Sequence, residues 1–113
     1  MESILTSIKK LLGISEEYRH FDKDIIMHIN SVFLILNQLG VGPKDVFFID
    51  DDSSEWVEFI PDGSNLELVK SYMYLRVRLL FDPPISSAAM ESVNRMISEF
   101  EWRLNVAVET EEG

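Results

Sequence analysis

Residues 65–84 read NLELVKSYMYLRVRLLFDPP and contain the most hydrophobic helical pattern in the chain. Apolar side chains recur at helical spacing along two stripes, Leu68, Tyr72, Leu75 and Leu79 in one and Val69, Met73, Val77 and Leu80 in the other. A helix that is apolar around so much of its circumference is either central to its domain or packs against a partner chain. We expect this helix over residues 65–81, ended by Asp82-Pro83-Pro84, because the residue before a proline is pushed out of the helical region.

A long amphipathic pattern follows this proline pair. Its apolar stripe consists of Met90, Val93, Ile97, Phe100, Leu104 and Val108. Ser86 or Ser87 is a suitable N-cap, so we predict a helix over residues 86–108, followed by an acidic tail over residues 109–113.

The link between these two helices is short, which favours an antiparallel helix hairpin. If both helices rise equally from a tight link, Arg76 lies near Glu91 and Lys70 lies near Glu99.

Two further helices are predicted in the first part of the chain. Ser3 is a plausible N-cap and Gly13 a suitable end for a helix over residues 3–12. Asp22 is expected to cap a second helix over residues 22–39, which stops at Gly40-Val41-Gly42-Pro43.

The middle of the chain lacks regular periodicity. Residues 46–49 form a short apolar run that does not distinguish a strand from a buried loop. Ser53 or Ser54 could cap a single helical turn around Trp56. The fold class is therefore mostly all-α, a small helical bundle with a C-terminal antiparallel helix hairpin and an irregular acidic middle segment. At this length we expect one domain over residues 1–113.

The charge distribution limits the classes of partner. The formal net charge is −10, and residues 41–67 carry eight acidic residues against Lys44 alone. Nucleic-acid affinity depends mainly on neutralisation of phosphates by Lys and Arg, so we expect no specific DNA binding. The chain has no cysteine, no signal-peptide pattern and no apolar run long enough for a membrane helix. We expect synthesis in a cytoplasm and no membrane association.

Residues 50–58 contain the one acidic cluster that suggests a metal site, Asp50, Asp51, Asp52, Glu55 and Glu58. The EF-hand pattern fails there, because Glu55 stands in the glycine position and Pro61 in the position of the last glutamate. A solvated acidic loop is the preferred interpretation. His20 and His28 have no ligand-like spacing, and no nucleophile or phosphate-loop motif occurs. We predict no enzyme, no catalytic residue, no metal and no cofactor.

Two segments favour protein binding, residues 76–84 (RVRLLFDPP) and residues 99–105 (EFEWRLN). They are either core residues with flanking salt bridges and a rigid turn, or parts of a subunit interface anchored by Trp102 and Arg103, since Trp and Arg dominate binding hot spots. The candidate interface residues are Arg76, Arg78, Asp82, Pro83, Pro84, Trp102 and Arg103.

Together with Asn30, Leu39-Gly40-Val41-Gly42 and the isolated Trp56, these two segments resemble the small head–tail connector (adaptor) proteins of tailed phages and prophages of Gram-positive bacteria. The resemblance extends from about Asp22 to Asn105. It implies a helical virion protein, made in the bacterial host cytoplasm, whose copies form a ring beneath the portal protein and above a tail-side connector protein. Genomic DNA would pass through this ring without specific binding.

The resemblance also leads us to expect particular contacts between the subunits of the ring. The helix over residues 65–81 would owe its excess apolar surface to neighbouring subunits, and the acidic middle segment would meet a basic surface. Two other hypotheses remain open at this point. The first is an acidic DNA-mimic inhibitor of a host nuclease, or another small protein-binding regulator. The second is an enzyme that uses a divalent metal at Asp50–Glu58.

Overall fold

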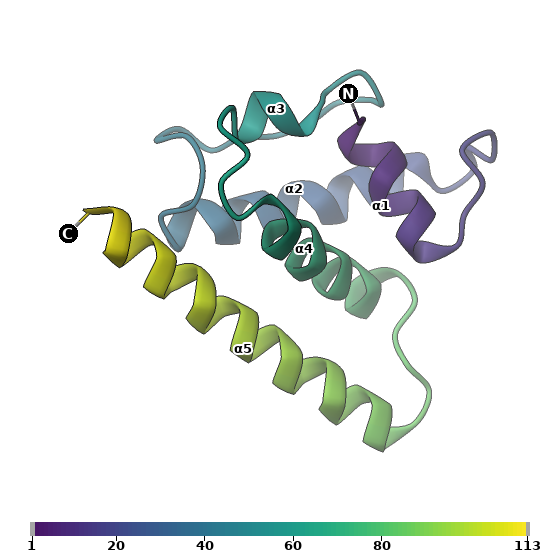
Figure 1. The fold of residues 1–113 in the computed structure, drawn as a ribbon. Helices are drawn as coiled ribbons and strands as arrows, with labels where there is room; N and C mark the ends of the chain where they lie inside the picture. The colour runs from purple at the N-terminus through teal and green to yellow at the C-terminus, as the bar shows by residue number, and fades with distance from the viewer. Residues whose placement is uncertain (1, 113) are drawn as a thin grey trace.

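The computed structural model describes residues 2–112, with side chains as far as Glu109. This part of the chain contains five helices and no strand: α1 (Ile4–Leu12), α2 (Asp22–Gln38), α3 (Trp56–Phe59), α4 (Leu66–Phe81) and α5 (Ser87–Glu112) (Figure 1). The prediction of a small helical fold is confirmed. None of the five helices is both long enough and apolar enough to cross a membrane.

Helix α4 is the central element. It packs against α1, α2 and α5, and Figure 1 shows it between α2 and α5. Val69, Tyr72, Met73 and Val77 are fully buried. The broad apolar circumference of α4 is therefore covered within the chain, because three helices contact it from different sides. The expectation that neighbouring subunits cover this surface is wrong for most of it, although Leu80 remains 55% exposed.

Helix α1 is joined to α2 through a buried lysine. Ser3 caps α1 by accepting a hydrogen bond from the Thr6 N–H, and Gly13 ends the helix in the left-handed conformation, as predicted. The Lys9 side chain is only 3% exposed. Its ammonium donates to the carbonyl oxygens of Glu16 (3.1 Å) and Tyr18 (2.8 Å).

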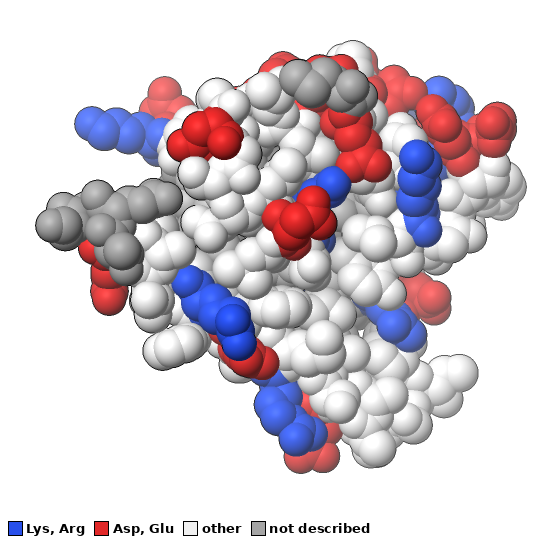
Figure 2. Space-filling view, viewed as in Figure 1, with Lys and Arg blue, Asp and Glu red and all other residues white. Residues whose placement is uncertain are grey.

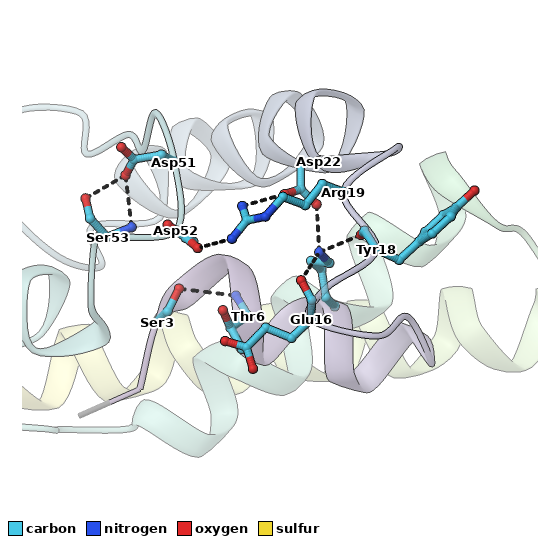
Figure 3. Close-up of polar contacts among 10 residues, drawn as sticks. Ser3, Thr6, Glu16, Tyr18, Arg19, Asp22, Asp51, Asp52 and Ser53 are labelled. Carbon is cyan, nitrogen blue, oxygen red and sulfur yellow. Dashed lines mark hydrogen bonds and ion pairs between the residues drawn. The ribbon is translucent and has the colours of Figure 1, made fainter.

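The third oxygen partner of the ammonium is Asp22, whose Oδ1 lies 2.8 Å from Lys9 Nζ (Figure 3). Asp22 is the first residue of α2, and the N-cap is Phe21, which makes no side-chain capping bond. The prediction that Asp22 caps α2 is therefore wrong, because its carboxylate is directed to the buried ammonium. Arg19 extends the network, since it contacts Asp22 (3.4 Å) and Asp52 (2.9 Å).

Helix α3 is a single turn that fixes the middle segment against the core. Its capping box is formed by Glu55 and Glu58, not by Ser53 or Ser54 as expected. Trp56 is 3% exposed, and its Nε1 donates to Ser7 Oγ at 2.8 Å. The residues before α3 form a loop: residues 46–49 are not a strand, and they pack on α2 through the aromatic pair Phe33–Phe47.

Helices α4 and α5 run in opposite directions (Figure 1), but their register differs from the prediction. Arg76 pairs with Glu101, ten residues further along α5 than Glu91, and Lys70 pairs with Glu2 instead of Glu99. The reason is the link, which is extended and contains two prolines, so α5 begins well beyond the end of α4.

Helix α5 is also longer than predicted. It begins where expected, with Ser86 Oγ accepting from the Ala89 N–H, but it continues to Glu112 instead of ending at Val108. The expected acidic tail is thus helical through Glu112, because nothing in its sequence stops a helix before Gly113. Gly113 and the side chains beyond Glu109 lie outside the described residues.

Replacement of Lys9 by methionine should destabilise the protein. It leaves the Asp22 carboxylate and two carbonyl oxygens without their buried partner, which costs about 3–5 kcal/mol for a broken buried ion pair. Lys10→Met is the matched control, since Lys10 is exposed and the change should stay within about 0.5 kcal/mol. Urea unfolding gives both free energies. Equal effects of the two substitutions would contradict a structural role of the buried ammonium.

Candidate protein–protein interface

Trp102 and Arg103 lie on the outer surface of α5. The inner face of this helix buries Val93, Ile97 and Leu104, and Trp102 is separated from Leu104 by about 200° around the helix axis. Trp102 is consequently 66% exposed. An indole of this size on the surface is unusual, because Trp is highly buried on average.

Arg103 lies beside Trp102 and binds its neighbour on the same helix. Its Nη2 lies 2.9 Å from Glu99 Oε1, and both side chains are 56% exposed. In Figure 2, basic and acidic side chains lie next to one another along the ridge that α5 forms. Exposed pairs of this type contribute little to stability, so Arg103 can exchange its partner at low cost.

Arg76 faces α5 within the hairpin, and its side chain is 32% exposed. Its Nη2 lies 2.5 Å from Glu101 Oε2, and its Nε donates to the Tyr72 hydroxyl at 3.0 Å. Tyr72 in turn donates to Glu101 at 2.6 Å. Arg76 therefore holds α4 to α5, and the core interpretation fits this residue better than the interface one.

The same network shifts the pKa values of its members. Burial and the hydrogen bond to Glu101 raise the pKa of Tyr72 to about 12. Burial alone would raise the pKa of Glu101, but the donors Tyr72 and Arg76 outweigh it, and the net effect is a lowered pKa. Glu101 thus remains ionised and stabilises the hairpin as a charged acceptor.

The remaining predicted interface residues lie at the other end of α5. Asp82 and Pro83 are exposed, Pro84 is half-buried, and Arg78 is half-buried with Nη1 3.4 Å from the Tyr74 hydroxyl. Trp102 follows Ser87 by fifteen residues, about 22 Å along the helix. The fold therefore separates the candidate residues into two surfaces instead of joining them into one patch.

A groove beside the C-terminal turns of α5 was not predicted from the sequence. It encloses about 520 Å³ between residues 40–43, residues 58–65 and the inner face of α5. Its lining is mostly apolar and includes Phe59, Leu104 and Val108, with Glu58 and Asp62 among the lining acids. The sequence signal nearest to this groove is Gly40-Val41-Gly42-Pro43 after α2. This pattern predicts the end of a helix, but it does not predict that residues 58–65 and α5 pack beside it.

Gly42 shapes the floor of this groove. Its φ is +91°, and a Cβ atom on it would overlap the Phe59 ring at Cε1. Only glycine combines this backbone conformation with such a close approach of the ring.

The acidic middle segment forms contacts within the chain. Asp51 accepts hydrogen bonds from the Ser53 hydroxyl (2.6 Å) and the Ser53 N–H (2.9 Å), which lower the pKa of Asp51 (Figure 3). Asp52 pairs with Arg19, and Glu58 accepts from the Glu55 N–H. Within the described residues, no three His, Cys, Asp or Glu side chains are grouped closely enough to hold a metal ion.

Comparison with protein families gives a match over most of the chain. Residues 4–111 match the family described as Phage connector protein. The chain belongs to this family. No curated protein and no solved structure matches the chain at the significance required.

Family membership implies a structural connector role in a phage and contacts with other virion proteins. It also implies a component of the virion. The inhibitor hypothesis receives no support from these comparisons. The match begins in α1 and ends in α5, so the groove and the exposed Trp102 both lie within the connector region.

Neutralisation of Glu101 should weaken the connector in a pH-dependent way. Its folded-state pKa is lowered, so its stabilisation is present above the unfolded pKa of about 4.3 and is lost as the pH falls through the folded pKa. Glu101→Gln should lower the unfolding free energy by on the order of 1 kcal/mol at pH 7, and the difference from wild type should vanish in acid. Urea unfolding over a pH series measures this. Glu99→Gln, which removes an exposed pair, should show little difference at any pH; the same profile for both variants would argue against a stabilising role of the half-buried Tyr72–Arg76–Glu101 network.

Alanine at Gly42 should destabilise the connector more than alanine at Gly63. Both positions have positive φ, which costs roughly 1–2 kcal/mol for a non-glycine residue. A Cβ at Gly63 meets open space, whereas at Gly42 it meets the Phe59 ring, which adds roughly 1–3 kcal/mol. Thermal unfolding of the two variants compares them directly. A loss at Gly63 as large as that at Gly42 would show that backbone strain alone determines the cost.

Proposed function

We propose that this connector assembles into a ring between the portal protein and a tail-side connector protein, and that genomic DNA passes through the ring. The family match over residues 4–111 is the observation that carries the proposal. The proposed role is structural, without catalysis, metal or cofactor. Assembly in the cytoplasm of a Gram-positive host is part of the proposal and follows from the sequence resemblance.

The charge of the connector supports a role as a passage for DNA. The chain has a formal net charge of −10, and acidic side chains predominate in the upper part of Figure 2, over α3 and the N-terminal region. A surface of the same sign as the phosphate backbone repels DNA and limits adhesion. The acidic middle segment is then also suited to meet a basic surface on a neighbouring virion protein.

The outer face of α5 around Trp102 supports a role in assembly. Trp102 presents a large apolar surface next to the charged Arg103, a pair of residue types enriched at the centres of interfaces. No intramolecular packing accounts for Trp102, which is 66% exposed, while Leu104 two residues later is 1% exposed. We assign the outer face of α5 to a ring contact.

Native mass spectrometry over a concentration series, with and without the portal protein, tests the proposal. The wild-type chain should form a closed ring, alone or on the portal, and negative-stain images should show it. Trp102→Ala should abolish this assembly and leave the circular dichroism of the helices unchanged. Phe48→Ala is the matched control, since Phe48 is 63% exposed but lies in the loop before α3, and it should assemble normally. A chain that stays monomeric with the portal present would refute the ring; normal assembly of Trp102→Ala would refute the assignment of α5.

A further inference from the structure

The groove and Trp102 lie on opposite sides of the same helical segment. Leu104 and Val108 line the groove from the inner face of α5, and Trp102 projects from the outer face within the same turns. The connector therefore presents an apolar hollow and an apolar projection at one end of the molecule.

We propose that the groove between residues 40–43, residues 58–62 and 64–65, and residues 104–108 of α5 receives Trp102 and Arg103 from a second copy of the chain. This inference rests on the proposed function, because it specifies the contact between neighbouring subunits of the ring. The groove volume of about 520 Å³ lies within the range of about 300–1,000 Å³ that is typical of binding pockets. Its floor of Phe59 and Leu104 suits an indole ring, which gains most from an apolar and aromatic environment.

Charge favours the same occupant. Glu58 and Asp62 line the groove and are exposed, and the segment that contains them has Lys44 as its single base. The Ser64 N–H donates to Asp62 at 2.9 Å and lowers the pKa of Asp62, so this carboxylate stays ionised. An incoming tryptophan with an adjacent arginine is complementary to an apolar floor with an acidic rim. Arg103 is available for this contact, because its pair with Glu99 is exposed.

The arrangement dictates the type of assembly. In a two-fold dimer, a single interface would have to place Trp102 of each copy in the groove of the other, which is unfavourable when the projection and the hollow lie on opposite sides of one helix. They instead form a heterologous contact, in which each copy donates Trp102 to one neighbour and receives it from the other. Contacts of this type close into rings when the rotation between subunits permits closure. The geometry of a single chain thus contains both halves of the proposed ring contact.

Cysteine crosslinking tests the contact directly, because the native chain contains no cysteine. Ser64→Cys places a thiol at the groove, and Val106→Cys places one next to Trp102 on the outer face of α5. The double variant, treated with a short bismaleimide under conditions in which native mass spectrometry shows rings, should give a ladder of covalent species larger than a dimer. Each single-cysteine variant should give no ladder. Ser31→Cys combined with Val106→Cys is the control pair, since Ser31 is exposed on α2 away from the groove.

Charge reversal provides a second measurement on the same variant. Asp62→Arg should reduce the yield of the ladder by about tenfold, because like charges then face each other at the contact. Arg103→Asp in the same chain should restore most of the yield.

The outcomes separate this inference from the proposed function. Rings without a ladder from the Ser64→Cys/Val106→Cys chain, or with a ladder from the control pair instead, would overturn the groove contact and leave the connector function in place. Absence of both rings and ladder with the portal protein present would overturn the ring itself, and the groove contact with it. Rings, a ladder specific to the groove pair and rescue by the charge swap would establish the contact.

Discussion

The buried ammonium of Lys9 is the constraint that fixes the N-terminal half of the connector. A charge in an apolar interior is tolerated only when oxygen atoms surround it, and Lys9 obtains three, from Glu16, Tyr18 and Asp22. Two of these oxygens belong to the loop between α1 and α2, and the third belongs to the first residue of α2. One side chain on α1 therefore determines the path of the chain between two helices and the point at which α2 begins. Arg19 and Asp52 continue the network to the segment before α3.

Once α1 and α2 are fixed, α4 is enclosed by the other helices. Little of the surface of α4 is then left for contacts with other proteins. Three helices cover α4, and the aromatic cluster of Phe33, Phe47 and Phe59 closes the remaining side of the core. Helix α5 is different, because it contacts the rest of the molecule along one face only. Its outer face is exposed from Ser87 to Glu109, the part of the helix whose side chains are described, a length of about 33 Å. A long helix with one free face is a natural place for subunit contacts in a small protein.

The sequence predicted the helices well and their mutual arrangement poorly. Periodicity and capping residues identified Ser3, Gly13 and the Pro83-Pro84 stop, because these signals act over one or two turns. The register of α4 on α5 depends on the direction of the link, and local patterns do not encode it; Arg76 consequently meets Glu101 instead of Glu91. The burial of Lys9 could not be predicted from the sequence either, because a lysine near the end of an amphipathic helix normally extends into solvent. Among the candidate interface residues, Trp102 is exposed on α5, whereas Arg76 faces Glu101 and Tyr72, a direction that the sequence pattern does not encode.

The proposed ring has to form from copies that carry a strong negative charge, and local apolar contacts between subunits would make this possible. Copies with a net charge of −10 repel each other at long range, but this repulsion is screened beyond about 8–10 Å in physiological salt. An indole buried in an apolar groove acts at contact distance, where screening is irrelevant and the arginine beside it offsets the nearest carboxylates. Exposed acids in the loop before α3, such as Asp45 and Asp50, would then face the proposed DNA channel or a basic neighbour. In such an arrangement, attraction between subunits and repulsion of DNA come from different parts of one small surface, and neither weakens the other.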